Sequence, residues 1–311
     1  MTIFELKPRP PYSMELQWRF YGSLEPQPEI YSNNIWRRIF TVKGKKIPVE
    51  VSAAGHVDSP LLRITAHAEL TDAEKSELAR KIALVFRLDD DLNELYDTLK
   101  GDKRLSRLFR LLYGFKPPVF GALVFEGIVR VITQQQVSLR VAYIANAEIV
   151  KRFGEKLTVN GVDYYDFPTA EALANAGVDG LRSCKLSRQK ARYIHELAKA
   201  AIEGYDFERP RLMGDEEVVQ ELTRFPGLGR WSAELVLTAV LARPHTSFPD
   251  DLGVRRAVAH YFFNDKPQPS EKVRKTIDHW GRFKGWITFY LLCGYLTEAA
   301  GNRRKEKLSG G

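Results

Sequence analysis

Residues 221–259 read ELTRFPGLGRWSAELVLTAVLARPHTSFPDDLGVRRAVA, and this stretch decides the fold of the chain. The preceding segment Asp215–Thr223 has acidic residues in its first turn and apolar residues at helical spacing, which predicts a short helix. Gly227 and Gly229 then allow backbone angles that other residues avoid. The nearly all-apolar run Ser232–Ala242 is long enough for a buried helix. The pattern therefore predicts two helices joined by a tight turn.

The turn leaves Leu228, Gly229 and Arg230 at the N-terminus of the second helix. Unpaired backbone N–H groups and the helix dipole favour an anion such as phosphate there. Glycines also let a nucleic-acid backbone approach without side chains in the way. Two glycines in isolation more often form an ordinary turn in a helical bundle, so the flanking residues must decide between these interpretations.

Phe225–Ala233 (FPGLGRWSA) and the loop that ends in Pro249–Asp251 (PDD) resemble the two signatures of the helix-hairpin-helix DNA glycosylase superfamily. The resemblance is greatest to the DNA-3-methyladenine glycosylase II (AlkA-type) branch. Further segments of that branch occur in the expected order: Pro10–Tyr12, Ile132–Val137, Asp166–Leu173, Leu186–Gly204 and Trp286–Glu298. The resemblance implies an enzyme of base excision repair that flips alkylated purines out of DNA and excises them.

The residue after Arg230 bears on the type of reaction. Members of the superfamily that also cut the strand have a lysine at this position, and its amine attacks the sugar and forms a Schiff base. This chain has Trp231, whose indole nitrogen has no lone pair available for that attack. The resemblance therefore implies a monofunctional enzyme. Trp231 could also be a plain core residue, but its place directly after the turn favours a position in the cleft.

Asp251 is the candidate catalytic residue, because the resemblance places the second aspartate of PDD in the catalytic position. Cleavage of an N-glycosidic bond builds positive charge on the sugar. A fixed carboxylate stabilises that charge, and it can also orient or activate the attacking water. Either aspartate of the pair could instead be an N-cap of the next helix. We assign capping mainly to Asp250 and chemistry to Asp251.

A pocket for the base is implied by the resemblance. Alkylation at N3 of adenine or N7 of guanine gives a cationic purine, which leaves readily and is attracted to aromatic faces. The resemblance assigns pocket positions to Phe20, Trp231 and Tyr295, which come from separated parts of the chain, as expected for a pocket between domains. A fourth position, usually tyrosine, is Leu235 here, which leaves the range of lesions open.

Gln134–Gln136 form a polar break between two segments with helical patterns. Three consecutive amides make a poor core, so we expect an exposed loop with Gln135 and Gln136 as DNA contacts. The resemblance assigns to Gln136 the wedge that fills the gap left by an extruded base, where an amide can stack and hydrogen-bond the orphaned base. A polar loop of this kind could also be merely solvated. The predicted DNA contacts also include the hairpin residues Gly227, Leu228, Gly229 and Arg230.

The composition agrees with a nucleic-acid partner. The net charge is +8 and the pI about 9.3, which suits a polyanion such as damaged double-stranded DNA. Basic residues cluster at Arg182–Arg192, at Arg255 and Arg256 and at Asn302–Lys307. We expect no membrane contact and no obligate protein partner, and we expect a monomer.

Two distant cysteines, Cys184 and Cys293, exclude a four-cysteine iron–sulfur cluster and give no zinc spacing. We expect no cofactor. The resemblance allows one structural Na⁺ or K⁺ at the hairpin, held by the backbone carbonyls of Thr223, Phe225 and Leu228. The low cysteine content, the absence of a signal-peptide pattern and the absence of an apolar run of membrane length predict a cytoplasmic protein, associated with the nucleoid if prokaryotic.

The chain of 311 residues favours two or three domains. We predict an α+β fold with an N-terminal antiparallel β-sheet domain and following helices in residues 1–105. This domain packs on an α-helical body in residues 106–311, in which two helical subdomains flank a cleft. The expected strands are Leu16–Tyr21, Trp36–Val42, Lys46–Val51 and Leu61–Ala66, Asp72–Phe86 is the first expected helix, and Val159–Asp166 is an excursion loop. The resemblance adds a TATA-binding-protein-like shape for the sheet.

Two other functions stay open at this point. A non-catalytic helix-hairpin-helix module would grip DNA for a partner, but it would not need Asp251 at the family spacing or an aromatic pocket. A glycosylase for oxidised purines would be expected to have lysine in place of Trp231. Deaminated purines such as hypoxanthine remain within the range of substrates that the sequence allows.

Overall fold

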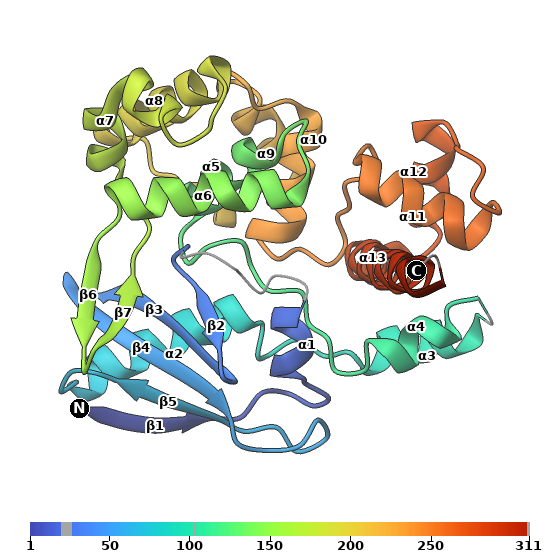
Figure 1. Cartoon of the computed structure of the whole chain (residues 1–311), viewed down its shortest axis with the longest axis horizontal. Helices are drawn as coiled ribbons and strands as arrows, with labels where there is room; N and C mark the ends of the chain where they lie inside the picture. Colours follow the sequence, from blue (N-terminus) through green and yellow to red (C-terminus); the bar gives the residue numbers. More distant parts are fainter. Residues whose placement is uncertain (20–26, 103, 310–311) are drawn as a thin grey trace.

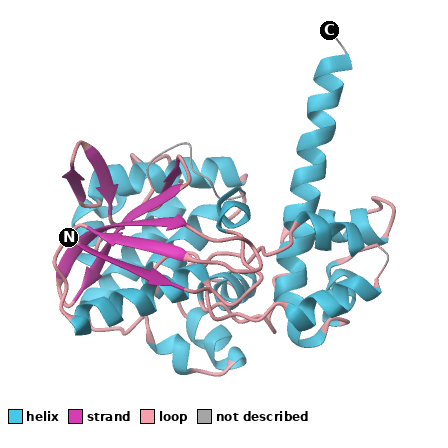
Figure 2. Ribbon diagram, turned by 90° about the horizontal axis from the view of Figure 1, so that it is seen from below, coloured by secondary structure: helices cyan, strands magenta, loops and turns pink. Residues whose placement is uncertain are grey.

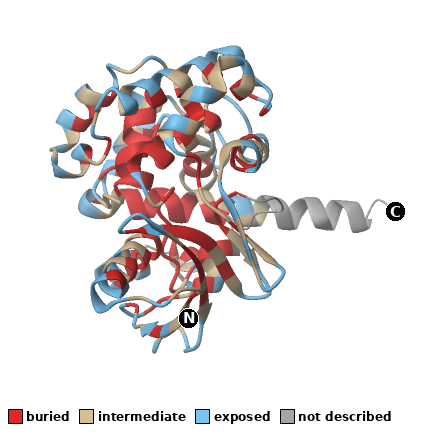
Figure 3. Cartoon of the chain, turned by 90° about the vertical axis from the view of Figure 1, so that its left-hand side faces the viewer, coloured by how far each residue is buried: buried red, intermediate tan, exposed pale blue. Residues whose placement is uncertain are grey.

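The computed structural model describes residues 1–19, 27–102 and 104–309, with Arg19 and the residues from 299 on described by their backbone alone (Figure 1). It contains an N-terminal sheet and a larger helical body, each with its own hydrophobic core. Figure 3 shows that buried residues concentrate where the sheet and the helices meet. Within the described ranges, no helix combines the length and the apolar composition needed to span a bilayer.

The N-terminal sheet is antiparallel throughout, as predicted, and its strand order is β1-β5-β4-β3-β2. Its strands are β1 (Thr2–Leu6), β2 (Ile30–Ser32), β3 (Ile35–Val42), β4 (Lys45–Ala53) and β5 (Leu62–Ala66). Helix α2 (Asp72–Phe86) buries Leu78, Ile82 and Phe86 in the core of this unit, and Thr71 caps it with a complete capping box. Figure 2 shows the strands at the end of the molecule opposite to the last helix.

The strand predicted at Leu16–Tyr21 is wrong, because Met14–Arg19 forms helix α1. Alternating apolar residues suggested the strand. However, Met14 and Trp18, four residues apart, are both buried, and this spacing puts them on one face of a helix. Ser13 supports the start of the helix, since its hydroxyl accepts a hydrogen bond from the backbone N–H of Leu16 at 3.3 Å.

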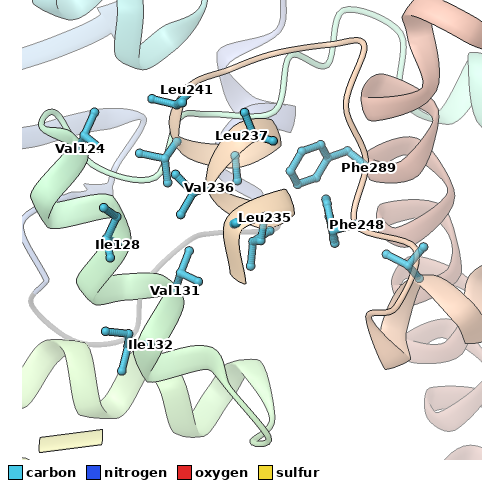
Figure 4. Packing of buried hydrophobic residues seen from close by; sticks show 14 of the residues in the cluster. Val124, Ile128, Val131, Ile132, Leu235, Val236, Leu237, Leu241, Phe248 and Phe289 are labelled. Atoms are coloured by element: carbon cyan, nitrogen blue, oxygen red, sulfur yellow. The ribbon is translucent and has the colours of Figure 1, made fainter. Parts of the chain in front are cut away.

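The remaining chain is almost entirely helical, as predicted. Its helices are α3 (Asn93–Gly101), α4 (Ser106–Leu111), α5 (Val124–Gln134), α6 (Leu139–Phe153), α7 (Ala170–Arg182), α8 (Arg188–Ile202), α9 (Asp215–Leu222), α10 (Arg230–Leu235), α11 (Leu252–Phe262), α12 (Ser270–Asp278) and α13 (Lys284–Ser309), with the short segments η1 (Arg209–Leu212), η2 (Val236–Val240) and η3 (Gly281–Phe283). Figure 4 shows α5 packed against the segment that contains Leu235 and Val236, with Phe248 and Phe289 on its other side.

The chain passes from the core of the sheet to the core of the helical body between Leu88 and Leu92, before the boundary predicted at residue 105. Leu88 belongs to the core of the sheet, whereas Leu92, Leu95 and Leu99 belong to the core of the helical body. Helix α3 therefore packs with the second unit, although the change from strands to helices in the sequence pattern occurs before it.

The expected excursion loop at Val159–Asp166 is instead part of a β-hairpin of β6 (Lys156–Val159) and β7 (Val162–Tyr165). This hairpin ties the helical body to the sheet. The hydroxyl of Tyr164 donates to Glu50 Oε1 at 2.9 Å, and Lys46 Nζ donates to Asp166 Oδ2 at 3.1 Å. Each bond joins residues more than 100 positions apart, so the hairpin helps to fix the relative position of the two units.

Candidate active site

The predicted hairpin is present: α9 ends at Leu222, a tight turn follows, and α10 begins at Arg230. The fold itself requires glycine at position 227. Its φ is +84°, and a Cβ there would lie 2.0 Å from Cδ2 of Tyr193 on α8. The backbone of the turn therefore lies directly against α8.

Gly229 differs from Gly227, because nothing within the described protein requires it. Its φ is −87°, which any residue can adopt, and a Cβ there would meet no atom within 4 Å. It occupies the N-cap position of α10 without a side-chain cap, beside the half-exposed Arg230. The open space at Gly229 is suited to the close approach of a ligand backbone.

The polar loop after α5 lies against this turn. Gln135 Nε2 donates to the carbonyl of Gly227 at 2.7 Å and to Ser232 Oγ at 3.1 Å. The side chain of Gln135 is thus committed to the hairpin. By contrast, Gln136 is exposed, has a left-handed backbone with φ +53°, and is followed by the exposed Val137. Gln136 is the glutamine whose position suits a wedge.

Asp251 is the N-cap of α11, and the assignment of capping to Asp250 is wrong. Oδ1 of Asp251 accepts hydrogen bonds from the backbone N–H groups of Gly253 at 2.8 Å and Val254 at 3.1 Å. The backbone of Asp251 is extended, which is the usual geometry of an N-cap, and so the second aspartate caps. Among the described residues, no donor bonds to Oδ2. One carboxylate oxygen is therefore fixed and the other is available.

Asp250 belongs to a set of charged residues that we call the hairpin cluster: Arg230, Glu234, Asp250 and Arg274. Arg274 donates to Glu234 at 3.0 and 3.3 Å and to Asp250 Oδ2 at 3.4 Å. Arg230 Nε donates to Glu234 Oε1 at 3.1 Å, and this hydrogen bond raises the pKa of Arg230. Ser270 also bonds to Asp250. The cluster connects the hairpin with the loop that bears Asp251.

The residues predicted for the pocket differ in their burial and in their neighbours. Trp231 is half-buried at the start of α10, whereas Leu235 lies in the core with 4% of its surface exposed. Tyr295 packs on His260 of α11 with a ring-centroid distance of 5.6 Å. Burial lowers the pKa of His260, but hydrogen bonds to two carboxylates raise it overall. Phe20 lies outside the described residues.

Two leucines near Asp251 were missed by the sequence analysis. Leu252 is 64% exposed at the first position of α11. The Cδ1 atom of Leu292 on α13 would lie 3.0 Å from a Cβ at Gly253. An apolar residue directly after PDD was a usable signal for Leu252. Nothing in the sequence pattern distinguishes Leu292 from the other apolar residues of its helix.

The predicted cation ligands are the backbone carbonyls of the hairpin turn. Within the described part of the chain, the carbonyls of Thr223 and Leu228 accept no backbone hydrogen bond outside regular helices, whereas that of Phe225 accepts one from Leu228 at 3.1 Å. Carbonyl oxygens without donors suit a hard monovalent cation, so two of the three positions fit this role.

Comparisons with known proteins agree with this geometry. Residues 129–282 match the family described as HhH-GPD superfamily base excision DNA repair protein. The solved structure of a 3-methyladenine DNA-glycosylase from Archaeoglobus fulgidus is 36% identical, with a TM-score of 0.84, and the match covers 93% of this chain and 97% of that chain. The DNA-3-methyladenine glycosylase of Bacillus subtilis (strain 168) is 28% identical over 83% of this chain and 86% of the relative. DNA-3-methyladenine glycosylase 2 of Escherichia coli (strain K12) is 30% identical over 56% of this chain and 57% of the relative.

Proposed function

The chain belongs to the HhH-GPD superfamily of base excision DNA repair proteins, and we propose that it excises alkylated purines, such as 3-methyladenine and 7-methylguanine, from DNA. It is a DNA glycosylase that hydrolyses N-glycosidic bonds. Solved structures of the same fold include glycosylases bound to DNA. The observation that supports the proposal best is the carboxylate of Asp251 at the N-terminus of α11, connected to the hairpin.

The geometry of Asp251 explains how a carboxylate can serve both the fold and the reaction. Two backbone N–H groups hold Oδ1 and so fix the orientation of the whole group. Oδ2 faces the sugar of the extruded nucleotide and stabilises the positive charge that develops as the base leaves. The same oxygen orients the attacking water or accepts its proton. Because the group is already held in place, little reorganisation is needed during the reaction.

The leaving group needs little help from the protein, because an alkylated purine is already cationic. Trp231 offers a ring face to such a base, and it replaces the amine that a lyase step would require. Base removal then ends with an abasic site and an intact strand. Tyr295 completes the proposed pocket, to which the buried Leu235 offers little surface.

DNA is held by the hairpin and opened by the loop after α5. The backbone N–H groups at Gly229 and Arg230 bind a phosphate, and Gly229 leaves room for it. Gln135 fixes the loop to the turn through the carbonyl of Gly227, so that Gln136 enters the gap in the duplex at a set distance from that phosphate. A Na⁺ or K⁺ ion on the carbonyls of Thr223, Phe225 and Leu228 would stiffen the same turn.

The decisive experiment compares Asp251→Asn with Asp250→Asn in single-turnover base release from methylated duplex DNA. Asparagine keeps a side-chain oxygen for the cap, so Asp251→Asn should fold and bind DNA. We expect its excision rate to fall by roughly 100-fold or more, the scale expected for an electrostatic group lost from a transition state. Asp250→Asn is the matched control and should retain most activity.

Strand breakage scored with and without alkali tests the monofunctional reaction. Breaks that appear only after alkali support hydrolysis, and breaks without alkali would require a lyase nucleophile. If the wild-type protein binds methylated DNA but releases no base, the chain is a non-catalytic module or acts on another lesion. Near-normal excision by Asp251→Asn would refute the role of Asp251.

A further inference from the structure

Lys190 on α8 connects the basic segment Arg182–Arg192 with the polar loop after α5. Its Nζ donates to the backbone carbonyl of Thr133 at 2.9 Å, across 57 positions of sequence. Thr133 is the last residue but one of α5, so its carbonyl belongs to the final turn, where a helix supplies no donor of its own. A cation at this end also matches the negative pole of the helix dipole. Lys190 therefore holds the point at which the polar loop leaves α5.

Lys190 occupies this position without a counter-ion. Among the described residues, no carboxylate contributes to the environment of its ammonium group, and burial alone lowers the pKa of Lys190. By contrast, Lys185 and Arg188 in the same segment are exposed and lie 3.9 and 3.6 Å from Glu148 and Asp179. A partly buried cation that faces a carbonyl rather than a carboxylate costs stability. Such an arrangement is more typical of functional sites than of structural ion pairs.

The second anchor of the loop is Gln135, two residues after Thr133. Its side-chain amide donates to the carbonyl of Gly227 in the hairpin turn at 2.7 Å. Gly227 in turn lies directly against Tyr193, which follows Lys190 by three residues on α8. Residues three apart share one face of a helix, so the same face of α8 supports the turn and the start of the loop. These contacts close a ring that joins α8, the hairpin turn and the loop.

Gln136 follows directly after the second anchor. It is exposed, and its backbone is left-handed with φ +53°. A residue other than glycine keeps this conformation where its surroundings impose it. On the other side of Gln136, Ser138 caps α6, since its Oγ accepts a hydrogen bond from the backbone N–H of Val141 at 3.4 Å. The ring before Gln136 and the cap after it therefore set the direction in which this side chain leaves the protein.

Resting on the glycosylase function and the wedge role of Gln136 proposed above, we propose that Lys190 is a positioning residue for base extrusion. It fixes the start of the loop, so that Gln136 enters the duplex already ordered. A group ordered in advance loses little conformational freedom on binding. A wedge on a released loop must be ordered at the expense of the energy that unstacks and unpairs the base. Lys190 therefore matters most where a base pair has to be broken.

A direct contact between Lys190 and a DNA phosphate would have a different signature. Phosphate contacts contribute to affinity whatever the bases are and however they are paired. Loss of such a contact would slow excision equally from paired and from unpaired lesions. Positioning of the wedge predicts instead a loss that is confined to paired lesions.

The test compares Lys190→Met with the wild-type protein in single-turnover release of 7-methylguanine from two duplexes. The lesion lies opposite cytosine in the first, and opposite an abasic-site analogue in the second, where no base pair has to be broken. We expect Lys190→Met to lower the first rate roughly tenfold, the scale of one lost hydrogen bond from a charged group, and the second by less than about twofold. Lys199→Met removes the same charge from the same helix, at an exposed side chain 3.7 Å from Glu196, and should leave both rates unchanged.

A double variant tests whether Lys190 acts through Gln136. In Gln136→Ala the wedge is absent, so adding Lys190→Met should change the ratio of the two rates no further. Lys190→Gln decides the outcome if Lys190→Met does not fold. Equal losses on both duplexes, an unchanged ratio in the folded variants or additive effects in the double variant would overturn the inference. Release of 7-methylguanine from neither duplex by the wild-type protein would instead refute the proposed function on which the inference rests.

Discussion

The junction cluster and the hairpin cluster have the same kind of composition but opposite surroundings. The junction cluster consists of Glu29, Arg38, Glu126 and Arg130, and in it each arginine binds both carboxylates. Like the hairpin cluster, it combines two arginines with two acidic residues. In the junction cluster, Arg38 and Glu126 are almost completely buried. In the hairpin cluster, Arg230 and Arg274 are 57% and 35% exposed at their side chains, and only Glu234 is buried.

The difference in burial indicates that the two clusters have different roles. Charges removed from water are costly to separate, so the junction cluster holds the sheet unit on α5 in one arrangement. Partly exposed ion pairs are weak and screened by salt. They can rearrange when a polyanion arrives, which suits the hairpin cluster at the DNA-binding turn. The buried cluster thus stabilises the fold, whereas we propose that the exposed one rearranges on DNA binding.

The largest contrast should appear between Glu126→Gln and Glu234→Gln in denaturant unfolding. Loss of Glu126 leaves Arg38 and Arg130 incompletely paired in the interior, and we expect the free energy of unfolding to fall by about 3–5 kcal/mol. Loss of Glu234 leaves its arginines access to water, and we expect a fall of about 1 kcal/mol. Equal losses would contradict the division between the two clusters.

A smaller effect should separate the two glycines of the turn. Gly227→Ala places a Cβ into Tyr193 at a left-handed φ, and we expect a loss of about 2 kcal/mol or more of unfolding free energy. Gly229→Ala meets no protein atom, so stability should be retained while affinity for duplex DNA falls. Thermal unfolding and a DNA-binding titration measure both effects. Unchanged DNA affinity in Gly229→Ala would remove the argument for a phosphate at that position.

The sequence predicted those parts of the site that depend on local chain geometry. The hairpin follows from two glycines between helical patterns, and helix α2 follows from its periodicity and its cap. Short-range rules failed where tertiary contacts decide. Leu16–Tyr21 satisfies both a strand and a helix pattern, and the packing of Trp18 against Trp36 favours the helix.

For a similar reason, the sequence could not predict which of Asp250 and Asp251 caps helix α11. Either residue can cap a helix, and the choice depends on Arg274 and Ser270, which engage Asp250 from α12.

A further predicted effect concerns Lys116, a fully buried lysine near the boundary between the two cores. Its Nζ donates to the carbonyls of Arg9 and Leu88 at 2.9 and 3.0 Å, and burial lowers its pKa to about 8. The native state therefore favours the neutral amine. Between pH 8 and the ordinary pKa of 10.5, the unfolded chain binds more protons, so this group makes stability rise with pH.

Lys116→Met removes that titration and nearly matches the side chain in length. We expect the unfolding free energy of the wild-type protein, relative to that of the variant, to increase from pH 7.5 to pH 10. The first pH lies about half a unit below the folded-state pKa, and the second lies about half a unit below the ordinary pKa. Urea unfolding of both proteins across this range measures the difference, in which the titration of other groups cancels. A difference independent of pH would mean that Lys116 keeps its proton in the folded protein. The boundary between the cores would then hold a buried charge that forms no ion pair with any described residue, whereas the junction cluster balances two arginines with two carboxylates.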